Sequence, residues 1–307
     1  MTTIAIIQAG TALGSIEKTL EKLDRLAGDA AQKGAKLAVF PEAFIGGYPK
    51  AVNFGSGIGF RNSDGRKRYH AYADSAISLR GGEAVNQLRE ITHKHGMFLV
   101  VGAVEREVTT LYNSLIYLAP DGKIMGVHRK LMFPMAERAY WQTGDGSTLP
   151  VFDTPLGNLG GLIRWENYMP QARMVMYHQQ VEVYCAPTVD DSSTWLPTVQ
   201  HIAREGGCFV LSSCQYLTHE DYPEGWLEYG AETPNIMIHG GSCLIHPSGN
   251  YIIEPVYDRE SVLTADIDLD EIVVGKQDFD VIRNFSRPDI FNLNFNSVPL
   301  SALTVHQ

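Results

Sequence analysis

The first part of the chain alternates between short apolar runs and longer stretches with helical spacing. Residues 3–8 form a short apolar run that predicts a strand, and residues 15–33 carry apolar side chains three and four positions apart, which predicts a helix. The same pattern returns as a strand over 36–40, a helix over 83–95 and a strand over 98–104. This alternation is typical of an α/β fold.

Glycine-containing turns add antiparallel strands to this pattern. Asp121-Gly122 lies between apolar segments at 111–118 and 123–128, and Gly157-Asn158 lies between segments at 151–154 and 159–163, so each predicts a hairpin. Strands that are separated by helices and joined by hairpins predict a mixed sheet covered by helices. The remaining predicted elements are a helix over 171–180, a strand over 181–186, a helix over 194–205, a strand over 208–213, a hairpin around Ser248-Gly249 and a strand over 262–267.

Two segments lack this periodicity. Residues 46–75 are polar and rich in glycine, which predicts a long surface loop at the border of a site. Beyond about residue 275 the alternation ends, and no linker interrupts the chain before that point. We therefore expect one domain over 1–275, large enough to bury a sizeable core, and a C-terminal tail over 276–307 that packs on a neighbouring surface or partner.

Charge and cysteine content narrow the possible partners. The net charge is −10 and the 25 basic residues are scattered, which argues against binding to nucleic acid or to an anionic membrane. No apolar run approaches the roughly 18 residues of a spanning helix, and the N-terminus lacks the pattern of a leader, so we expect a cytoplasmic protein. The four cysteines have no CxxC spacing, so they indicate neither a zinc site nor a disulfide framework.

Charged residues stand at two of the predicted strand ends. Glu42 directly follows the strand over 36–40, where α/β sheets often open onto a ligand crevice. A buried carboxylate there can act as a general base, and an exposed one is an ordinary loop residue. Lys130 ends the first hairpin seven residues before Glu137, where its ammonium could donate to a developing anion or belong to a basic surface. Taken singly, these residues leave both alternatives open.

Together with their neighbours, these residues form a recognisable series. FPEAF at 40–44, HRKL at 128–131, ER at 137–138, GDGS at 144–147 and GLIRWENYMP at 161–170 stand in the order and approximate spacing of the nitrilase family, which the sequence strongly resembles. The resemblance extends over residues 3–268. Further matching stretches lie at 184–188, 201–215 and 240–243.

The resemblance implies a fold and a chemistry. The fold is a four-layer α-β-β-α sandwich that pairs into a homodimer or a larger homo-oligomer. The substrate is a small nitrile, and the reaction uses no metal or cofactor. A cysteine attacks the nitrile carbon to give a thioimidate, and two waters then release ammonia and the acid through an acyl-enzyme. By position, Glu42 resembles the general base, Lys130 the group that stabilises charged intermediates, and Glu137 the second carboxylate, which positions lysine and substrate.

Arg164 departs from the family pattern. The family's nucleophilic cysteine precedes the Trp165-Glu166 pair, and this chain has an arginine there. A guanidinium stays protonated at physiological pH and cannot be the nucleophile, so we expect an inactive nitrilase-type hydrolase. We further expect Arg164 to fill the pocket and to pair with Glu42 or Glu137.

Three explanations fit the arginine. It can be a substitution in a nitrilase, the mark of a catalytically silent ligand-binding or assembly protein, or a sign that the nucleophile has moved, with Cys185 as the candidate. We favour the first, because Glu42, Lys130 and Glu137 are all retained.

The residues after the elbow indicate the branch of the family. Trp165-Glu166, with residues 186–188 later in the chain, favours the nitrile-cleaving branch, and an amidase or a cyanide-processing relative is the nearest alternative. We expect Trp165, Glu166 and Tyr48 to bind substrate, with core packing as the alternative for the two aromatic side chains.

Overall fold

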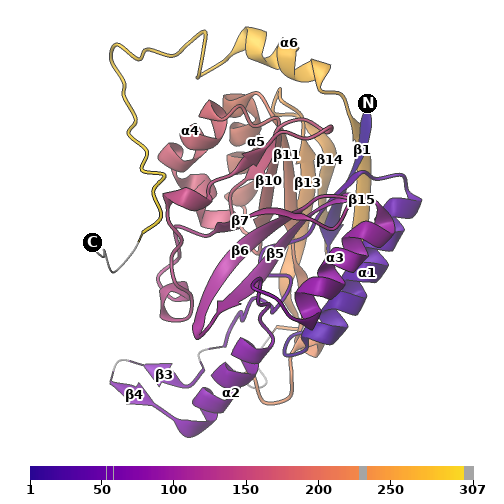
Figure 1. Cartoon of the computed structure of the whole chain (residues 1–307), viewed down its shortest axis with the longest axis vertical. Helices are drawn as coiled ribbons and strands as arrows, with labels where there is room; N and C mark the ends of the chain where they lie inside the picture. Colours follow the sequence, from indigo (N-terminus) through magenta and orange to yellow (C-terminus); the bar gives the residue numbers. More distant parts are fainter. Residues whose placement is uncertain (53, 58, 228–233, 301–307) are drawn as a thin grey trace, which may run out of the picture.

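Two β-sheets lie face to face at the centre of the molecule, and helices cover the outer face of each sheet (Figure 1). α1 (Ile16–Gln32) and α3 (Glu83–His95) pack on one sheet, and α4 (Pro170–His178) and α5 (Trp195–Gly206) pack on the other. The predicted four-layer α-β-β-α sandwich is confirmed. No helix in the described part of the chain has the length and apolar character to cross a membrane. The structure, a computed structural model, describes residues 1–52, 54–57, 59–227 and 234–300.

The first sheet is parallel at its centre and antiparallel at its edges. β1, β2 and β5 run parallel, which matches the alternation of strands and helices predicted for this part of the chain. β15 pairs with β1 at one edge, and β6 and β7 form the predicted hairpin at the other. In order across the sheet, the strands are β15 (Ser261–Ile267), β1 (Thr2–Gln8), β2 (Leu37–Val39), β5 (Phe98–Glu107), β6 (Thr110–Leu118) and β7 (Ile124–Arg129).

The second sheet repeats this plan. β9, β10 and β11 run parallel, and the predicted hairpins place β8 beside β9 and β14 beside β13. β12 is a short strand that the sequence pattern does not predict. In order across the sheet, the strands are β12 (Tyr216–Thr218), β13 (Ile236–Ile245), β11 (Phe209–Cys214), β10 (Val183–Thr188), β9 (Leu159–Gly161) and β8 (Val151–Phe152), and β14 (Tyr251–Tyr257) pairs with β13.

The central strands are apolar on both faces because each face meets a different core. In β1, Ile4 and Ile6 lie in the core between the two sheets, whereas Ala5 and Ile7 pack beneath α1 and α3. Successive side chains of a strand point to opposite faces, so two cores require two apolar sets. This explains why these strands are continuous apolar runs in the sequence.

The predicted loop over 46–75 contains regular structure, so this prediction is wrong in part. β3 (Ser56–Gly57) and β4 (Phe60–Arg61) form a small hairpin, and α2 (Ser63–Asp74) follows it at the lower end of the view in Figure 1. The Asn62 side chain accepts a hydrogen bond from the Gly65 N–H at 2.6 Å and caps this helix. α2 buries little of its surface, so its sequence has no apolar stripe that would predict a helix.

The C-terminal segment crosses the outside of the sandwich. After α6 (Asp270–Asp278) the chain continues to residue 300 past α4, as the yellow trace in Figure 1 shows. The Leu300 N–H donates to Asp145 Oδ2 at 2.8 Å. The predicted tail over 276–307 thus begins inside α6, and residues 301–307 lie outside the described part. Its exposed apolar side chains are Phe285, Ile290, Phe291, Leu293, Phe295, Val298 and Leu300.

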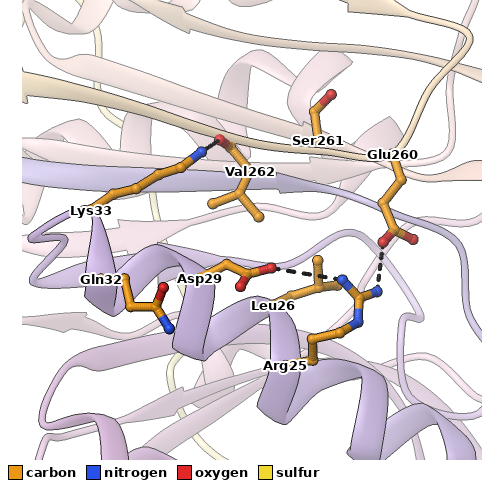
Figure 2. Close-up of a pocket in the computed structure, with 8 residues that line it drawn as sticks. All are labelled: Arg25, Leu26, Asp29, Gln32, Lys33, Glu260, Ser261 and Val262. Carbon is orange, nitrogen blue, oxygen red and sulfur yellow. Dashed lines mark hydrogen bonds and ion pairs between the residues drawn. The ribbon is translucent and has the colours of Figure 1, made fainter.

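Ion pairs attach α1 to the edge strand β15. Arg25 binds Glu260 at 2.6 Å and approaches Asp29 at 3.7 Å, and Lys33 Nζ donates to the Val262 carbonyl at 2.7 Å (Figure 2). These residues line a surface groove, in which Arg25 pairs with Asp29 and Glu260 and the ammonium of Lys33 binds a backbone carbonyl. The groove therefore belongs to the packing of helix on sheet, and the predicted site residues lie elsewhere.

Candidate active site

The four charged residues predicted from the motifs meet at one end of the sandwich. Glu42 follows β2 and Lys130 follows β7, so both come from the first sheet. Glu137 lies in the 3-10 helix η1 (Glu137–Ala139), and Arg164 begins the 3-10 helix η3 just after β9 of the second sheet. The site therefore bridges the two sheets at strand ends, where α/β proteins commonly hold ligands.

Lys130 lies between the two carboxylates. Its Nζ donates to Glu42 Oε1 at 2.5 Å and to Glu137 Oε2 at 3.0 Å. Lys130 and Glu42 are fully buried, and Glu137 is nearly so. Buried charges need partners, and here one ammonium serves two carboxylates. Across the described part of the chain, no three His, Cys, Asp or Glu residues are grouped so that they could hold a metal ion.

Arg164 supplies a second cation to the same network. Its Nη1 donates to Glu137 Oε1 and to the Tyr48 hydroxyl, each at 2.8 Å, and Tyr48 donates to the same Glu137 oxygen at 2.8 Å. Arg164 Nε lies 3.9 Å from Asp190 Oδ2. Burial lowers the pKa of Arg164, but Glu42, Tyr48 and Glu137 raise it by more, so the guanidinium stays charged. Of the two carboxylates expected to pair with Arg164, the structure selects Glu137.

The backbone at Arg164 makes a sharp corner. Its φ is +44°, in the left-handed region that residues other than glycine rarely adopt. Just before the corner, a Cβ on Gly161 would lie 1.9 Å from the Cys185 carbonyl oxygen, so only glycine lets β9 approach β10 this closely. After it, Asn167 Nδ2 donates to the carbonyls of Leu162 at 3.0 Å and Arg164 at 2.9 Å. The side chain at 164 is therefore held at a strained elbow between strand and helix.

Glu42 is the most deeply buried acid of the network. Burial raises its pKa, Lys130 and Arg164 lower it, and Glu137 raises it again, so that the net shift is upward. Asn113 Nδ2 donates to Oε1 at 2.8 Å, the oxygen that Lys130 also binds. Oε2 has no hydrogen-bond partner among the described residues. A buried carboxylate with a raised pKa and an open oxygen has the properties of a general base.

Glu166 does not have the surroundings of a substrate-binding residue. It is fully buried, and its Oε1 accepts from the Leu131 N–H at 2.6 Å. Its Oε2 accepts from the Ile163 N–H and from His128 Nε2, each at 2.8 Å. His128 Nδ1 also hydrogen-bonds the Thr148 carbonyl. The carboxylate thus holds η3 (Arg164–Tyr168) against the first sheet, and contact of Glu166 with substrate stays a prediction.

The two predicted aromatic contacts differ in their surroundings. The Tyr48 ring packs against Trp141 with 5.7 Å between ring centroids, and its hydroxyl belongs to the charged network. Burial raises the pKa of Tyr48, so it remains a neutral donor. Trp165 is 43% exposed and meets Tyr168 edge to face. Contact of either residue with substrate stays a prediction.

Cys185 has the surroundings of a core residue. It is fully buried in β10 and packs between the two sheets with Ile163 and Leu211. Burial raises the pKa of its thiol, which opposes formation of the nucleophilic thiolate. The geometry therefore gives no support to a nucleophile relocated to Cys185.

Two buried asparagines complete the site and do not appear among the predicted residues. Asn113 interrupts the apolar run over 111–118, and this polar residue within a buried strand was a usable signal. Asn167 lies inside the motif, but its hydrogen bonds to the elbow depend on a backbone conformation that the sequence does not reveal.

Comparison with known proteins shows the family of the chain. The sequence model of the carbon-nitrogen hydrolase family matches residues 3–277. The aliphatic nitrilase of Sinorhizobium fredii (strain HH103) is 45% identical over 300 residues, covering 97% of each chain. Nitrilase 2 of Arabidopsis thaliana is 43% identical over 306 residues, covering 97% of this chain and 90% of that one. The chain therefore belongs to the carbon-nitrogen hydrolase family, as its nitrilase motifs predict.

Solved structures share the fold at lower sequence identity. The NitFhit protein of C. elegans superposes with a TM-score of 0.75 at 20% identity, covering 96% of this chain and 67% of that one. A carbon-nitrogen hydrolase from Helicobacter pylori G27 gives 0.75 at 21% identity, covering 94% and 96%. These likenesses confirm the two-sheet sandwich and say nothing of substrate.

Proposed function

We propose that this chain is a nitrilase-type hydrolase whose site is complete except for its nucleophile, and that Arg164 makes it inactive. The observation that carries the proposal is Lys130 held between Glu42 and Glu137, with the side chain of the strained elbow directed at Glu137. The relatives described as nitrilases support the choice of nitriles over other substrates with carbon-nitrogen bonds.

With a cysteine at position 164, each group has a task. Glu42 takes the thiol proton, and the thiolate forms a carbon-sulfur bond to the nitrile carbon while the nitrogen gains a proton, giving a thioimidate. Water then adds, and the carbon-nitrogen bond breaks to release ammonia and leave a thioester. A second water breaks the carbon-sulfur bond, which releases the acid and restores the thiol. Lys130 stabilises the negative charge that develops on the nitrogen or oxygen bonded to the reacting carbon, and Glu137 orients Lys130.

Arginine at position 164 blocks this reaction at its first step. The guanidinium has no lone pair available to attack a nitrile, because it stays protonated. It also occupies the elbow and binds Glu137 Oε1 at 2.8 Å, next to the lysine that the substrate would need. The chain as written is therefore expected to fold with its acids and lysine in place and to release no ammonia.

The test is ammonia release from a panel of aliphatic, aromatic and arylaceto nitriles. We expect turnover in Arg164→Cys and none in the chain with Arg164. Arg164→Ala is the matched control, because it removes the guanidinium without supplying a thiol. Activity in Arg164→Cys but not in Arg164→Ala supports the proposal, and the panel identifies the preferred nitrile. Activity in the chain with Arg164, or none in a folded Arg164→Cys protein, contradicts the proposal.

The alternative is a silent protein that binds small nitriles, amides or acids without turning them over. This binding role is favoured by Glu137, whose two carboxylate oxygens already accept hydrogen bonds from Lys130, Tyr48 and Arg164. Such a protein should gain thermal stability when a ligand is added, while the cysteine variant stays inactive. An unchanged midpoint with every compound of the panel would count against the binding role.

A further inference from the structure

Asn113 links the base and the lysine of the site. It lies in β6, opposite Val104 of β5, and is fully buried. Its backbone carbonyl accepts from the Lys130 N–H at 2.8 Å, and its side-chain amide donates to Glu42 Oε1 at 2.8 Å. One residue therefore sets the position of both the lysine backbone and the carboxylate.

The two oxygens of Glu42 differ because of these contacts. Oε1 accepts from Lys130 at 2.5 Å and from Asn113 at 2.8 Å. Oε2 is buried without a partner among the described residues. Two donors on one oxygen fix the rotation of the carboxylate and leave the other oxygen to take up a proton.

We propose that Asn113 is a positioning residue, which pins Glu42 Oε1 so that Oε2 acts as the base toward the side chain at position 164. This inference rests on the proposed function, because it takes Glu42 as the general base. It concerns a neutral amide, which does not itself ionise at ordinary pH. Its effect passes through the orientation and the ionisation of Glu42.

The charged groups around Glu42 define what Asn113 adds. Lys130 and Arg164 favour the ionised carboxylate, Glu137 opposes it, and the Tyr48 hydroxyl lies within the same network. Replacing Arg164 by cysteine removes one of the two cations. The amide of Asn113 then becomes one of the few remaining groups that favour the ionised form, since Lys130 is shared with Glu137.

The experiment measures how fast the thiol of Arg164→Cys is alkylated by iodoacetamide as a function of pH, with the modified residue identified by peptide mass. The other cysteines are Cys185, Cys208, Cys214 and Cys243, all buried, and Arg164→Ala gives the background. The alkylation rate should fall at low pH as Glu42 becomes protonated, and we call this falling part of the pH profile the acid limb. Adding Asn113→Leu or Asn113→Asp should move this acid limb upward by about one pH unit, because the first removes a donor and the second adds an acid beside Glu42.

Ser114→Ala is the matched control. Ser114 is the next residue of β6, and its hydroxyl donates to Glu105, a carboxylate outside the network of Glu42. It should lower stability without moving the acid limb. An acid limb that stays in place in both Asn113 variants would overturn the inference, and so would a thiol at 164 that is unreactive at every pH.

The two proposals can fail separately. Alkylation needs no nitrile, so a shifted acid limb without ammonia release would support the role of Asn113 and refute the nitrilase proposal. Ammonia release from Arg164→Cys with an acid limb that the Asn113 variants do not move would support the nitrilase proposal and refute the role of Asn113.

Discussion

Removal of the Glu137 carboxylate should destabilise the folded protein, because both cations of the charged network bind it. Glu137→Gln keeps the shape of the side chain but leaves Lys130 with Glu42 alone, and leaves Arg164 with only Asp190 at 3.9 Å as an ion-pair partner among the described residues. Removing one partner from a buried ion pair costs about 3 to 5 kcal/mol. Arg164 retains 16% of its side-chain exposure and Lys130 keeps one partner, so we expect the lower value, about 3 kcal/mol.

Arg164→Met provides the other side of a double-mutant cycle. It leaves Glu137 with Lys130 and Tyr48, so it should cost about 2 kcal/mol, the value for a hydrogen bond to a charged group. Methionine also keeps a Cβ at the left-handed corner, so the backbone strain is unchanged. In the double variant the remaining pair of Glu42 and Lys130 is neutral overall. The double variant should therefore lose about 2 kcal/mol less free energy of unfolding than the sum of the losses in the two single variants.

Urea unfolding of the four proteins at pH 7 measures this coupling. If the destabilisation of the double variant equals the sum of the two single values to within about 0.5 kcal/mol, Glu137 and Arg164 are not coupled, because independent sites behave in that way.

Further predictions concern the elbow and the C-terminal segment. Burial lowers the pKa of His128, but the nearby Glu166 carboxylate raises it by more, so the net shift of the pKa is upward. The stability that this pair contributes is therefore fully present below the pKa of His128 in the unfolded chain, and it is lost as the pH rises through the pKa in the folded protein. His128→Gln should thus destabilise most near about pH 6 and progressively less toward about pH 9, as urea titrations across this range would show. Gly161→Ala should lower stability by about 4 kcal/mol or abolish folding, because its Cβ would lie 1.9 Å from a backbone oxygen, and thermal unfolding checks this. We also propose that the tail packs on a second copy of the chain, so deleting residues 279–307 should lower the association state in analytical ultracentrifugation, and an unchanged mass would contradict it.

The elements of the sandwich could be predicted because their local patterns agree with their burial. The strand at residues 3–8 is apolar on both of its buried faces, and the helix at 83–95 is apolar along its buried stripe. Turns such as Asp121-Gly122 mark the hairpins. α2 could not be predicted in this way, because a helix that buries only Gly65 and Tyr72 leaves no periodic signal.

The site was predictable to the extent that motif positions define it. The motifs placed Glu42, Lys130 and Glu137 in one network, and the charge of Arg164 indicated an acidic partner, although not which of the two. The hydrogen bonds of Glu166 could not be predicted, because its partners, the backbone of Ile163 and Leu131 and the ring of His128, come together only in the folded chain. For the same reason, Asn113 could be recognised as a buried polar residue but not as a partner of Glu42.

An otherwise intact nitrilase site that lacks its nucleophile at position 164 should form a covalent adduct only when a thiol is restored there. Intact-protein and peptide mass measurement after acid quenching detects such an adduct when a slowly turned-over nitrile is added to the chain with Arg164 and to Arg164→Cys. A covalent adduct is expected on the cysteine at position 164 of the variant, and none on the chain with Arg164. An adduct on Cys185, or any adduct on the chain with Arg164, would contradict the proposed inactive nitrilase site.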